Sequence, residues 1–161
     1  LLYKQDVIPE PDLTIKAIGY QWYWGYEYPD NGNFTYEAFM LQSADELEED
    51  KPFKRMLTTD TKVVVPVNKT VRMQVTAADV LHSWAIPAFG VKTDAVPGRL
   101  NETWFKAEKT GIFYGMCSEL CGVNHQSMPI EIHVVTQNEF DSWVEEAKTK
   151  YASDNSKFAN K

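Results

Sequence analysis

Four side chains that bind soft metal ions lie within twelve residues of one another, and this cluster constrains the fold more than any other feature. The cluster comprises Cys117, Cys121, His125 and Met128. Strand-like apolar segments flank it at 112–116 and 130–135, and Gly122 and Pro129 favour a loop over a continuous helix. A loop that joins two strands can fold back so that all four side chains converge. The sequence therefore predicts a β-protein with a ligand-bearing loop between two of its strands.

Short apolar segments separated by glycine and proline make up most of the remaining sequence. Residues 13–28 and 33–41 are expected to be strands joined by a turn at 29–32. Further segments of this kind are found at 63–67, 71–75, 81–86 and 101–106. Many short strands at this spacing are typical of a sandwich or barrel, so the predicted fold class is all-β.

One helix is predicted near the C-terminal end, over residues 137–150. Thr136 and Glu139 have the spacing of a capping box at its start. Its apolar stripe, interpreted as packing, consists of Phe140, Trp143, Val144 and Ala147. Residues 45–50 contain five acids in six positions, so an exposed loop or a short helix is expected there.

The charge balance excludes some classes of partner. The 161 residues include 16 Lys and Arg against 23 Asp and Glu, which gives a net charge of −7. Nucleic acid is not expected to bind, because phosphate binding needs clustered cations, whereas a basic protein partner fits this charge. The longest uncharged run, 80–91, has 12 residues, and a membrane-spanning helix needs roughly 20. Neither a spanning segment nor a signal peptide is predicted in this sequence.

The two cysteines are separated by only three residues, which leaves a local disulfide, a metal site or a redox pair open. Thiolates, an imidazole and a thioether together favour copper, whereas zinc gains little from a thioether. A mononuclear electron-transfer copper site uses one cysteine and two histidines. The second cysteine here would allow two thiolates to bridge two copper ions, and such a pair needs a second nitrogen ligand.

Only His82 and His133 remain to supply that nitrogen. His133 lies within an alternating apolar segment and is interpreted as a half-exposed strand residue. His82 lies 35 positions before Cys117, between Leu81 and Trp84, in surroundings that usually indicate a packed histidine. Beside a loop that lacks one nitrogen ligand, His82 becomes the expected fifth side chain of the site.

Three parts of the sequence resemble one known family. The ligand pattern is His82 followed by Cys117-Ser118-Glu119-Leu120-Cys121-Gly122-Val123-Asn124-His125 and Met128-Pro129. The aromatic segment 21–28 and the segment 86–99 accompany this pattern. Over roughly residues 12–148, they resemble the soluble domain of cytochrome c oxidase subunit II, which carries the binuclear copper centre called CuA.

This resemblance implies a cupredoxin-like Greek-key β-barrel or sandwich with a short C-terminal helix. The implied ligands of two copper ions are the bridging Cys117 and Cys121, the terminal His82 and His125, and the weak ligand Met128. The main-chain carbonyl of Glu119 would be a further weak ligand. Its carboxylate would bind magnesium at the border with catalytic subunit I, only in the assembled complex.

The resemblance also implies how electrons travel. Trp22 would be the exposed residue at which electrons from cytochrome c enter, whereas Tyr23 and Trp24 are interpreted as structural. The positions that match family docking residues are Gln21, Glu27, Asp60 and Asp79. A further family acid is replaced here by Asn33, so that contact is not expected. The domain would pass electrons to the haem-containing catalytic subunit, to which oxygen reduction and proton pumping belong by resemblance.

The same resemblance predicts the organisation of the chain. Residues 1–11 would be a stub that follows a removed transmembrane helix, residues 12–150 the copper domain, and residues 151–161 a polar tail. The domain would lie on the extracytoplasmic face of the inner membrane, which is the periplasmic side in a bacterium. Missing N-terminal helices would attach it there, so the chain is expected to be a soluble fragment.

Three alternatives remain at this stage. A structural β-domain with a Cys117–Cys121 disulfide would leave His82, His125 and Met128 without a role. The binuclear copper domain of nitrous oxide reductase uses the same site, but Glu119 and the aromatic segment favour the oxidase. Subunit II of quinol oxidases lacks these copper ligands, and the complete set in this sequence argues against it.

Overall fold

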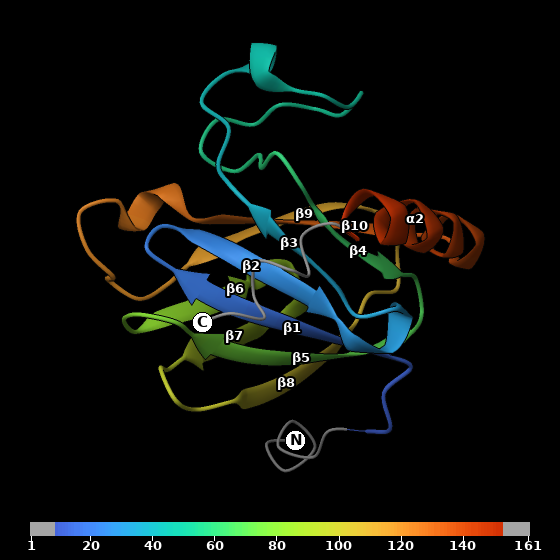
Figure 1. Cartoon of the computed structure of the whole chain (residues 1–161), viewed down its shortest axis with the longest axis horizontal. Coiled ribbons are helices and arrows are strands. Elements are labelled where there is room, and N and C mark those ends of the chain that lie inside the picture. Colours follow the sequence, from blue (N-terminus) through green and yellow to red (C-terminus); the bar gives the residue numbers. More distant parts are fainter. Residues whose placement is uncertain (1–8, 153–161) are drawn as a thin grey trace.

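Two five-stranded β-sheets make up most of the structure, a computed structural model that describes residues 9–152 (Figure 1). The first sheet contains, in spatial order, β3 (Phe34–Ala38), β2 (Tyr23–Tyr28), β1 (Leu13–Tyr20), β5 (Thr70–Ala77) and β8 (Asn101–Lys106). The second contains β4 (Val63–Pro66), β10 (Pro129–Val135), β9 (Gly111–Cys117), β6 (His82–Ile86) and β7 (Val91–Ala95). The predicted all-β architecture is confirmed. The expected stub and tail fall mostly outside the described residues.

The core lies between the two sheets, and the alternation of side chains decides which residues enter it. In β5, the buried residues Val71, Met73, Val75 and Ala77 alternate with half-buried ones. All five residues of β6 are buried, as expected for a strand covered on both faces. Most neighbouring strands are antiparallel, but β1 runs parallel to β5 and β4 runs parallel to β10. Pro66 closes β4 at a sheet edge, where the ladder does not need its missing N–H.

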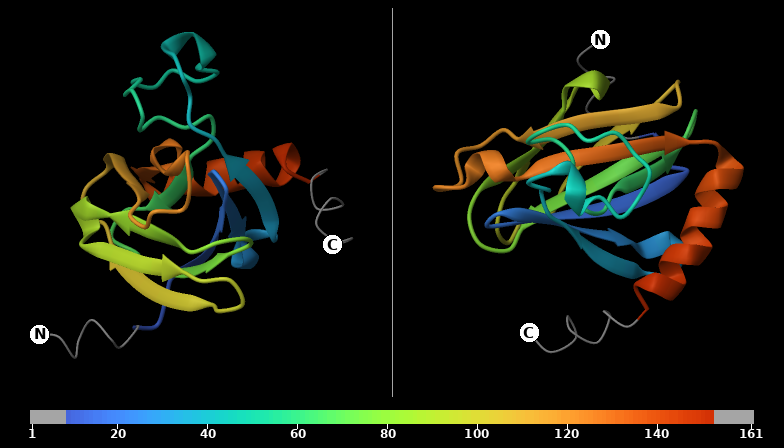
Figure 2. Two further views of the ribbon diagram at one scale, coloured as in Figure 1. Left: turned by 90° about the vertical axis from the view of Figure 1, so that its left-hand side faces the viewer. Right: turned by 90° about the horizontal axis from the view of Figure 1, so that it is seen from above.

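The single α-helix of the described chain, α2 (Gln137–Lys150), has the predicted bounds and packs beside β4 (Figure 2). The Glu139 main-chain N–H donates to Thr136 Oγ1 (3.3 Å), and the Thr136 N–H donates to Glu139 Oε2 (2.8 Å), so the capping box is confirmed. Phe140, Val144 and Ala147 are buried as predicted. No helix in residues 9–152 is both long enough and apolar enough to cross a membrane.

Three features of the strands differ from the prediction by more than a residue or two at a strand end. Residues 13–28 form two antiparallel strands, because the chain reverses at Gln21 and Trp22. That reversal carries none of the Gly, Asn or Pro signals of a tight turn, so the sequence pattern does not reveal it. The expected strand 33–41 ends at Ala38. β7 was not anticipated, because only Val91 and Ala95 of its five residues are buried.

A long segment, residues 39–62, leaves the sandwich between β3 and β4 and projects from it (Figure 1). It holds the acidic run, which forms one short 3₁₀ turn at Ala44–Glu46 and exposed loop, as predicted. At its base, Met40 pairs with Thr59 across an isolated β-bridge, and the Leu41 N–H donates to the Thr58 carbonyl at 2.9 Å. The two ends of the segment are thus held together.

A buried charge cluster fastens the 39–62 segment to β10. The Glu131 carboxylate, whose side chain is fully buried, lies 3.0 Å from Lys51 Nζ and 2.7 Å from His133 Nε2. It also accepts a hydrogen bond from the Thr59 N–H at 2.8 Å, while Lys51 donates to the Thr59 carbonyl at 2.7 Å. His133 is the half-buried strand residue that the sequence predicted, and its partner is this carboxylate.

Removing the charge of Glu131 should destabilise the fold strongly. Glu131→Gln leaves the ammonium of Lys51, whose side chain is only 4% exposed, without the Glu131 carboxylate. Breaking a buried pair in this way lowers the free energy of unfolding by about 3 kcal/mol. The matched control is Glu49→Gln, which breaks an exposed pair with Lys62 and should lower it by less than about 1 kcal/mol. Urea unfolding of both variants tests this expectation, and equal losses would contradict it.

Acid should weaken the same cluster. Burial raises the pKa of Glu131, but hydrogen bonds from His133 and Thr59 and the charge of Lys51 bring it below the ordinary value of 4.5. A carboxyl with a lowered folded-state pKa stabilises the fold above its unfolded pKa, and this contribution is lost as the pH falls through the folded value. As the pH falls below about 4.5, the free energy of unfolding should therefore decrease in the unchanged chain. It should decrease less steeply in Glu131→Gln.

Candidate metal centre

Three connections meet at one end of the sandwich and enclose the predicted site (Figures 1 and 2). They are the β1–β2 turn at residues 21–22, the β5–β6 connection at 78–81 and the β9–β10 loop at 118–128. Hydrogen bonds join the three, because Gln21 N–H donates to Asp79 and the side chain of Gln21 donates to the Cys121 carbonyl. The loop predicted to carry the ligands is therefore held by two other parts of the chain.

Strand pairing places His82 beside the first cysteine. β6 pairs with β9 so that Trp84 lies opposite Cys117, and the Ser118 N–H donates to the Ser83 carbonyl at 3.1 Å. His82, at the start of β6, is fully buried and points one ring nitrogen, Nδ1, at Cys117 Sγ, 4.0 Å away. The structure therefore places an imidazole nitrogen of His82 beside the thiol of Cys117.

The β9–β10 loop turns its three remaining ligands inward. The Cys117 N–H donates to the Met128 carbonyl at 3.1 Å and closes the loop at its base. A short 3₁₀ turn, His125–Ser127, reverses the chain before β10. Cys121 and Met128 are consequently buried, while His125 is half-buried.

The side chains predicted as ligands form one continuous cluster. Cys121 Sγ lies 3.8 Å from Cys117 Sγ, 3.5 Å from His125 Nδ1 and 3.6 Å from Met128 Sδ. Ligand atoms of His82, Cys117 and Cys121 all lie within 4.8 Å of one another. The Glu119 carbonyl oxygen lies 3.3 Å from Cys117 Sγ. The loop fold therefore brings together all five predicted side chains and the predicted carbonyl.

These separations suit a metal ion and exclude a disulfide in this structure. Two sulfurs in a disulfide are about 2.05 Å apart, whereas the two here are 3.8 Å apart and both cysteines are free. Typical metal–sulfur and metal–nitrogen bonds of about 2.3 and 2.1 Å can span sulfur–nitrogen distances of 3.5 to 4.0 Å. The donors are two thiols, two imidazoles and a thioether, so they fit a soft metal such as copper.

The two thiols differ in their tendency to ionise. Burial raises the pKa of Cys117, but the neighbouring His82 imidazole and main-chain hydrogen bonds lower it below its ordinary value. Burial and the adjacent Cys117 thiolate raise the pKa of Cys121. Cys117 is therefore the thiol that loses its proton more readily, and binding of a metal cation to both sulfurs would release their protons.

Trp22 lies against the loop, on the turn between β1 and β2, and is half-buried there rather than exposed as the resemblance implies. Its Nε1–H donates to the Cys121 carbonyl at 3.3 Å, and Gln21 Nε2 donates to the same oxygen at 3.0 Å. A Cβ on Gly122, whose φ is +124°, would lie 3.2 Å from Trp22 Cζ2, so the glycine permits this close approach. Trp22 is half-buried and Trp24 is fully buried, which agrees with a structural role for Trp24.

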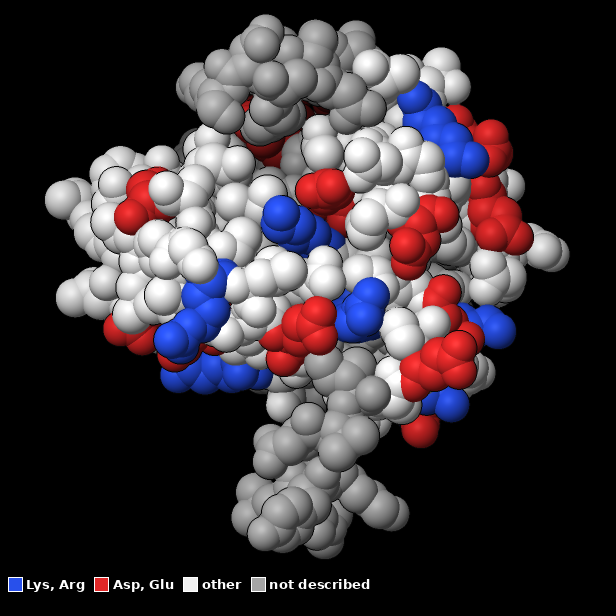
Figure 3. Space-filling model, turned by 60° about the horizontal axis from the view of Figure 1, so that its bottom comes forward, with Lys and Arg blue, Asp and Glu red and all other residues white. Residues whose placement is uncertain are grey.

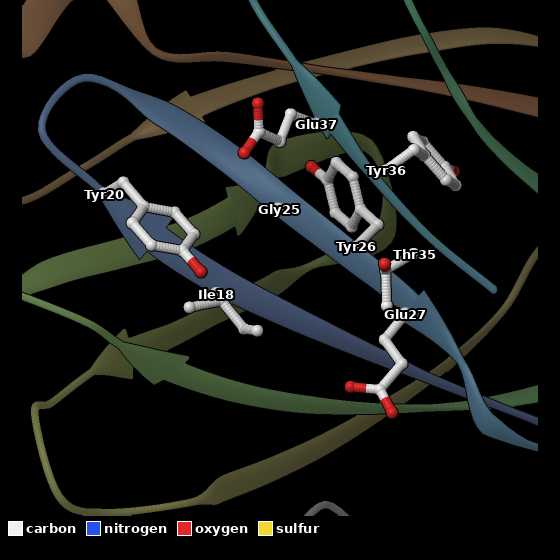
Figure 4. A pocket seen from close by; sticks show the side chains of 8 residues that line it. All are labelled: Ile18, Tyr20, Gly25, Tyr26, Glu27, Thr35, Tyr36 and Glu37. Carbon is white, nitrogen blue, oxygen red and sulfur yellow. The ribbon is translucent and has the colours of Figure 1, made fainter. Parts of the chain in front are cut away.

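The four predicted docking residues are not all together. Gln21 and Asp79 border the cluster, and Asp60 lies at the base of the 39–62 segment, where it accepts a hydrogen bond from the Phe39 N–H at 2.8 Å. Glu27 stands on the outer face of β2, in a hollow of about 100 Å³ shared with Tyr20 and Glu37 (Figure 4). On the face drawn in Figure 3, acidic and basic groups are interspersed over the described residues.

Sequence reasoning missed two contacts of the centre. The Gln21 side chain binds the Cys121 carbonyl, and the Asp79 carboxylate binds His82 Nε2 at 2.8 Å. The resemblance assigns both residues to docking only. The spacing of Asp79 and His82 is the one signal in the sequence that could have indicated the second contact.

Comparison with known proteins identifies one family. Residues 13–135 match the family described as cytochrome c oxidase subunit II, periplasmic domain. Cytochrome c oxidase subunit 2 of Cereibacter sphaeroides is 51% identical over 163 residues, which cover 92% of this chain and 54% of that protein. A probable cytochrome c oxidase subunit 2 of Rickettsia bellii is 51% identical over 161 residues, covering 99% and 58%. The chain spans about half the length of these curated relatives.

Two solved structures have the same fold. The periplasmic domain of subunit II of cytochrome oxidase from Bradyrhizobium japonicum is 59% identical, with a TM-score of 0.83 over 90% of this chain and 99% of that one. The second is a mixed disulfide intermediate between a thioredoxin-like protein and subunit II of cytochrome c oxidase. It is 57% identical, with a TM-score of 0.77 over 91% of this chain and 97% of that one.

Proposed function

Because the chain belongs to the family of the periplasmic domain of cytochrome c oxidase subunit II, we propose that it is the electron-accepting copper domain of such an oxidase. It would receive electrons from cytochrome c and pass them to the haem-containing catalytic subunit. The observation that carries the proposal is the convergence of two cysteines, two histidines and a methionine from β6 and one loop. Residues 12–150 are the proposed domain.

Two copper ions bound here would supply one-electron redox chemistry. In the proposal, the thiolates of Cys117 and Cys121 and the imidazoles of His82 and His125 would hold them. The buried thioether of Met128 and the Glu119 carbonyl are weak ligands. The surrounding strands hold these groups in place, so their positions change little when an electron arrives or leaves.

The partners and location follow from the same family membership. We propose that cytochrome c docks beside Trp22, with Gln21, Glu27, Asp60 and Asp79 contributing to a surface attractive to a basic protein. Glu119 would bind magnesium only with subunit I in place. The domain would face the periplasm at the inner membrane, held by transmembrane helices of the complete protein.

A redox step is proposed to precede metal binding. A related subunit II has been trapped as a mixed disulfide with a thioredoxin-like protein. In this chain, a disulfide between Cys117 and Cys121 would remove both proposed bridges. A thioredoxin-like reductant is therefore proposed to keep the pair reduced until the metal is loaded.

Copper loading tests the function directly. The reduced chain should take up two coppers, and electron paramagnetic resonance should show one unpaired electron delocalised over both. Reduction by cytochrome c, followed by stopped flow, should then slow steeply as salt is added, because surface charges are screened. One localised copper would point to a mononuclear site, and no copper would remove the proposed function.

Met128 should tune the centre without being required for it. Met128→Leu keeps the buried volume and removes the thioether, so the variant should bind two coppers but show a shifted reduction potential. Redox titration of the loaded variant measures the shift. An unchanged potential at full copper content would exclude Met128 as a ligand.

Trp22 should control the rate of electron uptake. Trp22→Phe keeps an aromatic ring but loses the indole N–H that reaches the Cys121 carbonyl. Reduction by cytochrome c should slow by about tenfold or more, which corresponds to about 1.4 kcal/mol in the barrier, while cytochrome c binding stays nearly intact. The control is Trp104→Phe on β8, which lies outside the centre. Equal rates for both variants would contradict the assignment.

A further inference from the structure

We propose that Asp79 is a positioning residue for His82, which it holds in the tautomer and orientation that a metal ligand needs. The inference rests on the copper site proposed above and gives Asp79 a role beyond docking. Its starting observation is that the two nitrogens of one imidazole face different partners. Nε2 lies 2.8 Å from Asp79 Oδ1, and Nδ1 lies 4.0 Å from Cys117 Sγ.

The partners of the ring assign its tautomer. An ionised carboxylate only accepts hydrogen bonds, so Nε2 of His82 must carry the hydrogen that points to Asp79. In the neutral ring, Nδ1 then carries the lone pair, and that lone pair points at the thiol cluster. A carboxylate behind a metal-binding histidine is a recurring arrangement that raises the basicity of the ligand and fixes its ring.

Packing restricts the orientations that the ring can adopt. His82 is fully buried, and the Trp24 ring meets it edge-on with centroids 6.1 Å apart. A Cβ on Gly19 would lie 2.7 Å from His82 Cδ2, so the imidazole occupies the space that the glycine leaves. The Asp79 carboxylate therefore binds Nε2 of a ring whose movement is already restricted by its neighbours.

The same carboxylate also joins the connections around the centre. Asp79 Oδ2 accepts a hydrogen bond from the Gln21 N–H at 2.7 Å, and Oδ1 accepts one from the Val80 N–H at 2.6 Å. Gln21 in turn holds the Cys121 carbonyl. Asp79, whose side chain is 33% exposed, thus links the β5–β6 connection to the β1–β2 turn and, through Gln21, to the loop of Cys121.

The charge of Asp79 should favour the oxidised metal centre. A negative group behind the imidazole makes Nδ1 a stronger donor, and a stronger donor stabilises the more highly charged copper state. Removing the charge should consequently raise the reduction potential. A residue that only docks cytochrome c would leave the potential unchanged.

Two variants and one control test the proposal. Asp79→Ala removes the acceptor, whereas Asp79→Asn keeps an acceptor oxygen but loses the charge. Asp60→Asn removes the same charge from another proposed docking position, whose carboxylate accepts hydrogen bonds from the Phe39 and Thr61 N–H groups. The metal-free chains are examined by long-range ¹H–¹⁵N NMR of the imidazoles. The copper-loaded chains are examined by chelator competition and redox titration.

In Asp79→Ala, we expect His82 to populate both tautomers and copper affinity to fall by about 10- to 100-fold. Asp79→Asn should keep the single tautomer but raise the reduction potential, and Asp60→Asn should change neither quantity. If Asp79→Ala does not fold, the reduction potential of Asp79→Asn, compared with that of Asp60→Asn, tests the inference.

The inference would be overturned by a single His82 tautomer in Asp79→Ala. It would also be overturned by equal reduction potentials in Asp79→Asn and Asp60→Asn. An unchanged chain that bound no copper would refute the copper site, whereas the NMR result would still test the positioning.

Discussion

Cys121→Ser is expected to abolish the proposed binuclear copper centre. The Cys121 sulfur lies within 3.8 Å of a second sulfur, an imidazole nitrogen and a thioether, so it adjoins three other predicted ligands. A serine hydroxyl is a hard, weakly ionised ligand that cannot bridge soft metal ions as a thiolate does. Metal counting should show at most one copper per chain, and the delocalised paramagnetic signal should disappear.

A control in the same loop separates loss of a ligand from damage to the loop. Val123 is 90% exposed, so Val123→Ser should retain two coppers. Thermal unfolding without metal adds a second comparison. If the pair served as a structural disulfide, Cys121→Ser would destabilise the chain under oxidising conditions. A serine variant that still held two coppers would exclude Cys121 as a bridge.

Gly115→Ala is expected to damage both the fold and the centre. A Cβ at this position of β9 would lie 1.9 Å from the Ala85 carbonyl oxygen and 2.5 Å from Ile86 Cδ1. The nearest atom belongs to the backbone of β6, so relief requires the two strands to separate. Overpacking that shifts the backbone lowers the free energy of unfolding by about 3 kcal/mol or more. Because β6 carries His82 and β9 carries Cys117, the same shift should reduce copper binding.

Gly90→Ala is the matched control, since nothing lies within 4 Å of a Cβ there. Its φ of +64° means that alanine should still lower stability by about 1 kcal/mol. Denaturant unfolding and copper titration of both variants distinguish the two effects. Equal destabilisation, or full copper binding in Gly115→Ala, would show that β6 and β9 can move apart freely.

Much of the centre could be predicted from the sequence, because its ligands are concentrated in one short loop. Cys117, Cys121, His125 and Met128 are close in the chain, so any turn within the loop brings them near one another. His82 could be inferred only because the loop lacked a nitrogen. α2 was equally predictable, since its capping box and apolar stripe are local patterns.

The contacts that support the centre depend on residues far apart in the chain. The Cys121 carbonyl is held by Gln21, which precedes it by 100 positions, and Glu131 is held by Thr59 across 72 positions. Neither pair has a sequence pattern, because each contact exists only when particular strands pair in a particular register. The reversal at Gln21 and Trp22 belongs to the same class.

The sequence alone therefore determined the donor set, the metal class that it suits and the all-β architecture. The spacing of ligands within a loop and the alternation of apolar residues within a strand are short-range properties, so they are visible in the sequence. Only the tertiary structure decided which nitrogen of His82 faces the cysteines, what holds the opposite nitrogen, and how the 39–62 segment is fastened. These features arise where the two sheets and three connections meet, since buried polar groups must find partners there, whatever their distance in the sequence.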